Sequence, residues 1–474
     1  MPPARTTPTG GSWPIVVAAT AALIMNLDTA VNIALPAIST AFSLEVAEIT
    51  WLVVCYVLTY ACLLVTTGRL ADAFGHERVL RYGLAISLLG LAGAGLAPSW
   101  PLFLGARVVQ GAGAALVLGA APALVTTSVA PERAGRALGQ FQFGVALGFA
   151  AGPPLGGMLT QWLDWRWVYL FRIPLAAGLL VLVWLRPTGA AGPPSGKRIP
   201  LDLAGTLSLG GAVAAGLLAL NRGPQSGWDS PLVLAGAALF LPLLGYWVLA
   251  ERRSHAPALD PQLFRSVGFA VANVLSAAAN AAMFMIWLLA PYYLVTTLGY
   301  SPVIGGLLLA ANPLATALVA PWAGRWSALV GAGRLAVLGL AIETVGLAAI
   351  SRLGPDSSPA SVALALGCVG LGIGVFTVPN LSLVMGAIAR HQQGVAGGLT
   401  QMTRTVGVVS GVALGSLALT QLRQRQAGRL GVAAADAVTF LPAFSKVFLG
   451  AAGLTGLAAL LSVTRAGDRE KGPG

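Results

Sequence analysis

The stretch "GRLADAFGHER", Gly68 to Arg78, joins two apolar runs and recurs in outline 256 residues later as "GRWSALVGAGR", Gly324 to Arg334. Each copy begins with Gly-Arg, has a second glycine seven positions after the first, and ends with an arginine three positions after that. The repeat predicts two homologous halves. Chance matching among the 60 glycines of the chain is the alternative.

The composition on either side of this stretch is that of a membrane protein. Of the 474 residues, 56% are hydrophobic and 9% are charged, whereas a soluble domain carries about 25% charged residues. Windows of about 20 apolar residues, enough to cross roughly 30 Å of hydrocarbon as a helix, recur along the chain. Because lipid cannot satisfy open backbone, the spans must be helices. We therefore expect an all-α polytopic membrane protein and exclude an ordinary soluble enzyme.

The apolar windows predict fourteen transmembrane helices. They lie at residues 14–38, 49–68, 79–97, 101–126, 135–160, 166–186, 201–220, 231–250, 267–294, 303–323, 334–351, 359–384, 396–421 and 442–464. The repeat groups them into two pseudo-symmetric six-helix bundles, residues 1–186 and 256–474, with two inserted helices in residues 187–255. Gly113 and Pro122 in the fourth span recur as Gly370 and Pro379 in the twelfth. Many transporters built from such repeats hold substrate near the midplane between the halves.

The basic residues predict the orientation in the membrane. Lys and Arg gather in cytoplasmic loops, and most of the 28 basic residues lie at the two termini and in the loops that follow even-numbered spans. We therefore place both termini in the cytoplasm. The net charge of +12 is spread over short loops, so it indicates topology and not nucleic-acid binding. The first apolar run is too long for a signal-peptide core, which predicts that it remains as a helix.

No residue pattern predicts a cofactor. Cys55, Cys62 and Cys368 lack the spacing of a metal site. The sequence "AGPPSGKR" around Lys197 lacks the glycine spacing and the Ser/Thr of a phosphate-binding loop. We therefore expect no metal, no cofactor and no ATP hydrolysis by this chain.

Two of the 16 acidic residues, Asp28 and Glu343, lie deep within predicted spans. A charged side chain there costs about 2.5–3.5 kcal/mol on insertion scales and usually faces a cavity. As access to water alternates, a carboxyl in a cavity can bind a proton from one side and release it to the other. Asn32 lies one turn after Asp28 and could hydrogen-bond to the acid or to a substrate. A structural hydrogen bond for Asp28 and structural pairing for Glu343 are the alternatives.

Four stretches resemble the signatures of one family. Besides the loop at 68–78, they are "RVVQGAGAA" (107–115) in the fourth span, "GFAAGPPLGG" (148–157) in the fifth, and "DWRWVYLFRIP" (164–174) at the start of the sixth. By their order and placement, the chain resembles the major facilitator superfamily, and specifically its fourteen-helix drug:proton antiporter branch, over nearly its full length. That branch separates the acid of the first span from the next Asn by five residues, whereas Asp28 and Asn32 are four apart.

The resemblance implies a set of gating residues in the loop and in the fifth span. They are Gly68, Arg69, Asp72, Gly75, Arg78, Gly152, Pro153, Gly156 and Gly157. Gly75 permits a tight turn, and glycines at 148, 152, 156 and 157 form a stripe that lets another helix approach closely. Pro153 and Pro154 are expected to break the hydrogen-bond ladder and bend the helix. A loop that only sets topology, and ordinary helix packing, are the alternatives.

Arg107 and a group of uncharged residues are the remaining candidates. The resemblance implies that Arg107 takes part in proton coupling, and snorkelling to the outer interface is the alternative. The predicted substrate cavity draws on Asn32, Gln110, Gln140, Gln142, Met283, Trp287, Asn312 and Asn380. Aromatic and Met side chains offer adaptable apolar contact for varied lipophilic compounds. For any single one of these residues, a packing or lipid-facing role is the alternative.

We hypothesise a proton-coupled antiporter that exports hydrophobic or amphipathic drugs and antibiotics across a bacterial cytoplasmic membrane by alternating access. The substrate class is implied by the resemblance. The expected partners are a small lipophilic substrate, protons and membrane lipid, with a monomeric chain and no nucleic acid. The alternatives are an exporter or flippase of a lipid-like or endogenous metabolite, and a non-transporting membrane sensor or scaffold.

Overall fold

The computed structural model describes residues 12–188, 229–253, 266–386, 393–430 and 437–468, with scattered residues between 205 and 227. Every regular element in these ranges is a helix, which confirms the all-α prediction. Thirteen segments of the described chain are long and apolar enough to cross a membrane. They match the predicted spans other than the seventh, at 201–220, which lies largely outside the described residues.

The helices of the N-terminal part begin with a broken first span. Their bounds are α1 (Trp13–Asn26), the 3-10 turn η1 (Leu27–Thr29), α2 (Ala30–Phe42), α3 (Val46–Phe74), α4 (His76–Leu96), α5 (Trp100–Thr127), α6 (Pro131–Trp162), α7 (Trp167–Leu170) and α8 (Arg172–Leu185). Proline stands in the first turn of α5 and of α6, where its missing N–H would have no helical partner.

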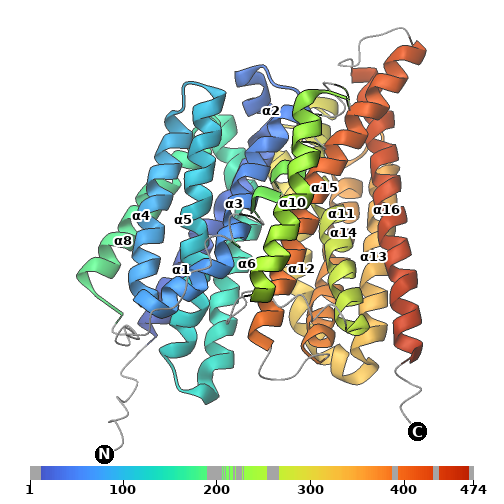
Figure 1. Cartoon of the computed structure of the whole chain (residues 1–474). Helices are drawn as coiled ribbons and strands as arrows, with labels where there is room; N and C mark the ends of the chain where they lie inside the picture. Colours follow the sequence, from blue (N-terminus) through green and yellow to red (C-terminus); the bar gives the residue numbers. More distant parts are fainter. Residues whose placement is uncertain are drawn as a thin grey trace, which may run out of the picture.

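The rest of the chain adds one inserted helix and a second group of long helices. Their bounds are α10 (Pro231–Arg253), α11 (Val267–Tyr292), the π turn η3 (Tyr293–Thr297), α12 (Pro302–Val330), α13 (Ala332–Ser351), α14 (Pro359–Gly386), α15 (Gln393–Leu430) and α16 (Ala437–Asp468). Figure 1 shows α1 to α8 gathered on one side and α11 to α16 on the other, with α10 in front of their junction. The start of α1 and the end of α16 lie at the same end of the bundle, called here the terminal side; the opposite end is the far side.

The repeated loop has the same backbone conformation in both copies. Gly75 joins α3 to α4 with φ +95° and ψ 131°, and Gly331 joins α12 to α13 with φ +95° and ψ 135°. A residue with a Cβ rarely adopts this conformation, so the two glycines are required by the turn. The helix that follows each turn also packs alike, because Gly83 meets α5 near Gly113 while Gly339 meets α14 near Gly372. The sequence repeat therefore corresponds to a structural repeat.

Two spans differ from the sequence-based expectation. The first is interrupted at η1, where Leu27–Thr29 form a 3-10 turn between α1 and α2. In the fifth, α6 continues without interruption through Pro153 and Pro154, so the expected break in the helix does not occur. A proline in a helix removes one donor, and the residues on either side can continue the ladder.

The glycines of α6 face two different partners. Gly144, Gly148, Gly152 and Gly156 recur every four residues and meet the first span, so they form one packing face. A Cβ at Gly152 would lie 1.9 Å from Thr29 Oγ1. Gly157 does not belong to this stripe, because a Cβ there would meet the carbonyl oxygen of Pro302 in α12. The fifth span therefore packs against the first span and, near its end, against the C-terminal half.

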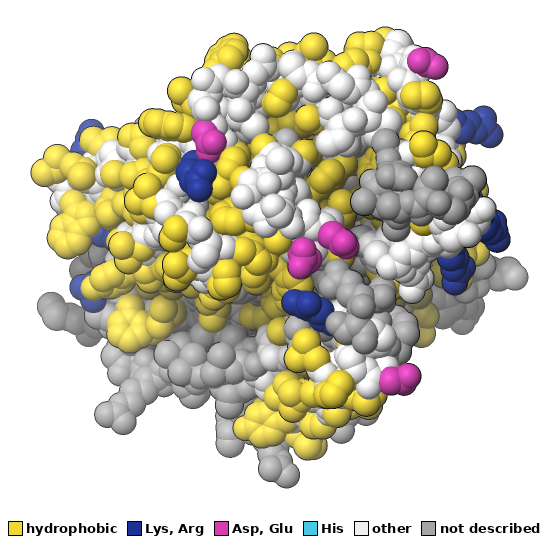
Figure 2. Space-filling view, turned by 90° about the horizontal axis from the view of Figure 1, so that it is seen from above, with side chains coloured by type: hydrophobic (Ala, Val, Ile, Leu, Met, Phe, Trp, Pro, Cys, Tyr) yellow, Lys and Arg dark blue, Asp and Glu magenta, His cyan; other side chains and the backbone are white. Residues whose placement is uncertain are grey.

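The far side is closed by contacts between the halves. Ser39 Oγ and Tyr292 Oη are 2.5 Å apart, and a cluster of buried apolar side chains includes Leu35 and Ile38 of α2 together with Leu289 of α11. Gly157 lies against Pro302, and Gly306 of α12 lies equally close to the carbonyl oxygen of Pro153. Figure 2 views this face and shows mainly apolar and uncharged side chains, with few charged groups between them. The two halves are therefore in direct contact on the far side.

Candidate functional site

A cavity of about 390 Å³ lies between the two halves. Its lining comes from both parts of the first span, from α3, α5 and α6 of the N-terminal half, and from α11 and α15 of the C-terminal half. Along α5 the lining residues run from Arg107 to Pro122, which at 1.5 Å per residue is roughly 22 Å. Pro122 lies near the terminal side, so the cavity extends from the middle of the bundle in that direction, away from the closed far side.

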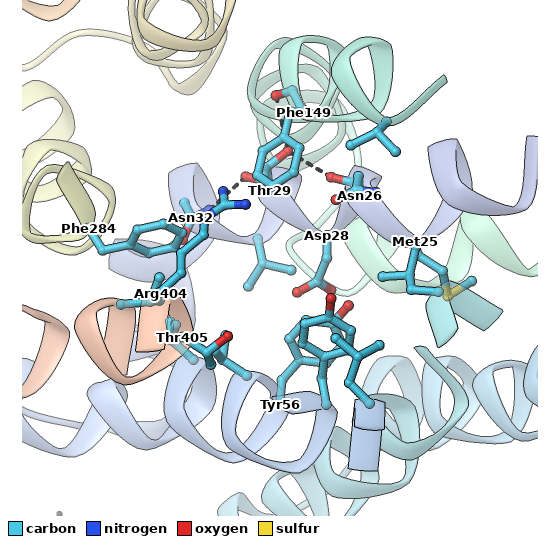
Figure 3. Close-up of a pocket in the computed structure, with 18 of the residues that line it drawn as sticks. Met25, Asn26, Asp28, Thr29, Asn32, Tyr56, Phe149, Phe284, Arg404 and Thr405 are labelled. Carbon is cyan, nitrogen blue, oxygen red and sulfur yellow. Dashed lines mark hydrogen bonds between the residues drawn. The ribbon is translucent and has the colours of Figure 1, made fainter. Parts of the chain in front are cut away.

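Asp28 is placed in this cavity by the break in the first span. Thr29 helps to fix the break, because its hydroxyl lies 3.1 Å from the carbonyl oxygen of Asn26 and 3.3 Å from that of Phe149 in α6, and its single hydrogen is shared between these acceptors. The missing side chain at Gly152 lets Thr29 approach α6 this closely. Figure 3 shows Asp28 pointing into the pocket, toward Tyr56 of α3. The side chain of Asp28 is 13% exposed, through the cavity.

The carboxylate of Asp28 is held by two arginines and an amide. Arg107 donates from Nη1 to Oδ1 at 2.8 Å and from Nη2 to Oδ2 at 2.9 Å. Arg172 Nη1 and Gln110 Nε2 each donate to Oδ1 at 2.9 Å. Arg107 and Arg172 are almost fully buried, at 1% exposure each. One negative charge is therefore balanced by two positive charges in the interior of the N-terminal half.

Further hydrogen bonds and an aromatic ring hold the guanidinium of Arg107 in place. Its Nε donates to the carbonyl oxygen of Leu52 at 3.1 Å, and its Nη1 donates to Gln110 Oε1 at 2.7 Å. Its guanidinium carbon lies 4.4 Å from the ring centre of Tyr56, a cation–π contact. Arg107 does not extend to the membrane interface, so the snorkelling alternative does not describe its position. Its role in proton coupling stays a prediction.

A third arginine, Arg404, reaches the same cavity from the C-terminal half. It lies on α15, lines the cavity and is half-buried. Its Nε donates to Asn280 Oδ1 on α11 at 3.1 Å. Among the described residues no carboxylate lies within ion-pair distance of it. Figure 3 shows Arg404 entering the pocket from the side opposite to Asp28.

The predicted substrate residues separate into those that reach the cavity and those that do not. Asn32 and Gln142 line the cavity. Gln110 is not a lining residue, but its side chain donates a hydrogen bond to Asp28, which is. Asn32 Nδ2 donates to the carbonyl oxygen of Thr29 at 3.1 Å, so in this structure it bonds to the backbone and not to Asp28. Gln140 is exposed and is not among the lining residues.

Four other predicted residues are packed inside the C-terminal half. Met283 and Trp287 belong to an apolar cluster formed with α13, α14 and α16. Asn312 Nδ2 donates to the carbonyl oxygen of Leu366 at 3.4 Å, and Asn380 Nδ2 donates to that of Ala272 at 3.0 Å. In this structure these four residues therefore contact neighbouring helices and do not line the cavity.

Glu343 is buried far from Asp28 in the packing of α13. It has no exposed surface, and neither carboxyl oxygen has a hydrogen-bond partner among the described residues. Its backbone lies against Gly372 of α14, where a Cβ on the glycine would be 2.4 Å from Glu343 N. It is not a lining residue of the cavity. Whether Glu343 binds a proton stays a prediction.

The loop between α3 and α4 is arranged around a residue that the sequence did not single out. Glu77 is buried, forms an ion pair with Arg81 one turn later, and accepts a hydrogen bond from the backbone N of Thr188 at 2.7 Å. Gly68 lies at a helical position and Arg78 is exposed. The side chains of Arg69 and Asp72 lie outside those that the structure describes. The predicted latch therefore stays a prediction.

Sequence reasoning assigned no role to Arg172, Tyr56 or Arg404. The available signal was position, because Arg172 and Arg404 are basic residues inside apolar spans, where a charge usually faces a partner or a cavity. Tyr56 gave no signal, since aromatic residues are common in membrane spans. In the described part of the chain no group of His, Cys, Asp and Glu could hold a metal ion.

Comparison with known proteins gives consistent matches along the whole chain. A family model described as Major Facilitator Superfamily matches residues 17–412 and also residues 272–473. The puromycin resistance protein pur8 of Streptomyces alboniger is 32% identical over 420 residues, which cover 85% of this chain and 80% of that protein. The cephamycin export protein CmcT of Amycolatopsis lactamdurans is 33% identical over 411 residues, which cover 84% of this chain and 83% of that protein.

Two further comparisons extend these matches. The riboflavin transporter RibZ of Clostridioides difficile is 26% identical over 383 residues, which cover 81% of this chain and 82% of that protein. Among solved structures, the crystal structure of the POT family transporter PepTSo superposes with a TM-score of 0.70 at 16% identity, covering 97% of this chain and 98% of that one. At this identity the structural likeness concerns the fold alone.

Proposed function

Because the chain belongs to the major facilitator superfamily, we propose that it is a proton-coupled antiporter that exports hydrophobic or amphipathic compounds, antibiotics among them. The names of similar proteins, which include puromycin resistance and cephamycin export, support export of small organic molecules. The observation that carries the proposal is the position of Asp28, an acid held by Arg107 and Arg172 on the wall of the cavity between the halves.

The arrangement supports a coupling step at Asp28. The carboxylate accepts hydrogen bonds from two guanidinium groups, and these bonds are strong because both partners are charged. A proton that binds Asp28 removes the negative charge that holds Arg107 and Arg172. The two arginines are then buried without a counter-charge, which is costly. Protonation therefore favours a different arrangement of the helices that carry the three residues.

The cavity wall supports binding of a lipophilic substrate. Tyr56 and Tyr60 of α3, Phe141 and Phe149 of α6, and Phe284 of α11 all line it. Aromatic side chains give large apolar contact areas with little loss of conformational freedom. A volume of about 390 Å³ lies within the range of small-molecule pockets, roughly 300–1,000 Å³. The cavity thus fits a drug-sized ligand.

Orientation and gating follow from placing both termini in the cytoplasm. The terminal side is then the inner side, and the structure is an inward-facing state with its outer side closed. Opening to the outside requires the separation of Ser39 from Tyr292 and of Gly157 from Pro302. We assign this far-side gate to the fifth span, with Gly152, Pro153, Gly156 and Gly157. The loop with the repeated turn at Gly75 lies at the other end of α3, on the terminal side, and we assign to it, with Gly68, Arg69, Asp72 and Arg78, a latch of that inner side.

The rest of the proposed organisation follows the sequence repeat. The two bundles, residues 1–186 and 256–474, move against each other, and residues 187–255 supply the inserted pair of helices. The protein acts as a monomer in a bacterial cytoplasmic membrane and uses the proton gradient without a cofactor. Glu343 is proposed as a second proton-binding residue, separate from the cavity.

Efflux from cells tests the proposed function. A host without its own drug pumps is loaded with a fluorescent lipophilic dye, and dye loss is followed with and without the chain. We expect faster loss with the chain and no difference once an uncoupler collapses the proton gradient. Efflux that persists unchanged after uncoupling, while ATP is also depleted, rules out proton coupling.

Export of an endogenous metabolite is the second candidate. It is favoured by the similarity to a protein named riboflavin transporter. The same host, grown without added drug, separates the two possibilities. Accumulation of one cellular metabolite in the medium only when the chain is present supports metabolite export.

A further inference from the structure

We propose that the cavity selects substrates that carry an anionic group such as a carboxylate, and that Arg404 is the residue that pairs with it. The inference rests on the proposed exporter function and names the substrate class of the same cavity. It starts from the balance of charge around the cavity, which is positive.

The positive charge of the cavity is not compensated by acids. Asp28 is the one acidic residue among the described residues that line it, whereas Arg107 and Arg404 are both lining residues and Arg172 lies directly behind Asp28. The negative charge of Asp28 is already shared by Arg107 and Arg172. A cationic ligand would therefore meet a net positive wall, and an anionic ligand would be attracted to it.

Arg404 is the arginine that remains available to a ligand. The guanidinium of Arg107 is occupied by Asp28, by Gln110 and by the carbonyl oxygen of Leu52. Among the described residues, Arg404 makes one hydrogen bond, from Nε to Asn280 Oδ1. Since that bond uses Nε, the two Nη groups remain for a ligand, and a guanidinium can bind a carboxylate with two parallel hydrogen bonds.

Asn280 makes Arg404 a positioned group rather than a mobile surface charge. Asn280 is 6% exposed, and its Nδ2 donates to the carbonyl oxygen of Ser276 one turn earlier at 2.8 Å. This bond orients the Oδ1 atom toward Arg404 Nε at 3.1 Å. A neutral amide fixes the guanidinium without neutralising it. The charge of Arg404 is thereby preserved for a ligand.

The surroundings of Arg404 suit the apolar part of such a ligand. Phe284 from the same half and Phe149 and Tyr60 from the other half line the same cavity, and Figure 3 places Phe284 and Phe149 near Arg404. An amphipathic organic acid could place its carboxylate on Arg404 and its ring system among these side chains. Such a ligand contacts both halves, so it would bind differently as the halves separate.

Three dansyl compounds with the same fluorophore test the charge preference. Dansylglycine is negative, its methyl ester is neutral, and dansyl-ethylenediamine is positive at neutral pH. Fluorescence titration of the purified full chain gives a dissociation constant for each. We expect dansylglycine to bind at least about tenfold more tightly than the ester, the scale of a hydrogen-bonded charge pair, and the amine to bind most weakly.

Variants then assign the preference to one residue. Arg404→Gln is expected to remove the preference for dansylglycine, and Arg404→Lys to retain part of it. Asn280→Asp keeps Arg404 but places a carboxylate beside its Nε. This variant should therefore also bind dansylglycine more weakly than the wild type does. Arg352→Gln, at an exposed arginine of the far side, is the control and should bind all three probes like the wild type.

The outcomes separate this inference from the proposed function. If the wild type binds and exports the ester or the amine in preference to dansylglycine, the chain is an exporter and the anion preference is wrong. If Arg404→Gln and Asn280→Asp both keep the preference for dansylglycine, Arg404 is not the selecting residue. If the dye-efflux test shows proton-dependent export but the wild type binds none of the three probes, the exporter function stands and the anion site is contradicted.

Discussion

Arg107 donates to both carboxylate oxygens of Asp28, from Nη1 at 2.8 Å and from Nη2 at 2.9 Å. This fork joins the first span to α5 across 79 positions of sequence, and it is almost completely buried. A planar guanidinium matches a carboxylate in a way that an ammonium group cannot. The pair therefore provides geometry as well as charge at the point where the first span is interrupted.

Arg107→Lys tests the need for this geometry. Lysine keeps the charge but cannot make two parallel hydrogen bonds to Asp28 together with the bond to the carbonyl oxygen of Leu52. We expect proton-driven export in vesicles to fall by at least about tenfold, since each hydrogen bond to a charged group contributes about 1.5–3 kcal/mol. Arg166→Lys, at a more exposed ion pair with Asp164, is the control. Equal rates for Arg107→Lys and wild type would show that charge alone is needed.

Gly152→Ala tests the contact that fixes the interrupted span. A Cβ at this position would lie 1.9 Å from Thr29 Oγ1, so the first span and α6 must move apart. Overpacking of this kind typically costs about 1–3 kcal/mol, and we expect a clearly lower thermal unfolding midpoint for the purified chain. Gly139→Ala, on the same helix with nothing within 4 Å of the added Cβ, should be neutral or stabilising. Equal losses in the two variants would contradict the role of the contact.

Gly157→Ala tests closure of the far side. The added Cβ would lie 2.2 Å from the carbonyl oxygen of Pro302, which belongs to the other half. We expect the variant to shift toward a state in which the far side is open. Spin labels would be placed at S43C, in the loop between α2 and α3, and at S358C, in the loop between α13 and α14; both positions are exposed on the far side. The distance between the two labels should then be longer than in the wild type. A distance distribution identical to that of the wild type would show that the contact between Gly157 and Pro302 does not control opening of the far side.

Glu343→Gln tests the proposal that Glu343 binds a second proton. The amide has nearly the same shape, and Glu343 has no hydrogen-bond partner among the described residues, so folding should be kept. We expect export to continue with fewer protons moved per substrate, measured from the dependence of substrate accumulation on the imposed pH gradient. An unchanged proton number would assign Glu343 a structural role.

The sequence was sufficient for the fold because the membrane restricts the choices. Lipid requires closed helices of about 20 residues, so hydropathy located the thirteen spans that the described residues contain. The repeated loop was informative for a local reason: the turns at Gly75 and Gly331 both require positive φ. Because this conformation favours glycine, both turns can be recognised from the sequence.

The site was only partly predictable because hydropathy does not show which way a residue faces. A helix that is apolar on all sides gives no periodic signal, so Met283 and Trp287 were predicted for the cavity but lie in a packed cluster. The interruption at Leu27–Thr29 was not predicted, because it depends on contacts between Thr29 and α6. The pairing of Arg172 with Asp28 joins positions 144 apart and required the three-dimensional structure.

Proton-driven transport by Asp28→Asn in reconstituted vesicles is the most direct test of coupling at this acid. The amide cannot exchange a proton, so we predict that the variant loses accumulation of substrate against its gradient while it still exchanges substrate between the two sides. Asp164→Asn, at a side chain that is 46% exposed, should pump like the wild type. Accumulation by Asp28→Asn at the wild-type level under the same pH gradient would contradict a coupling role for Asp28.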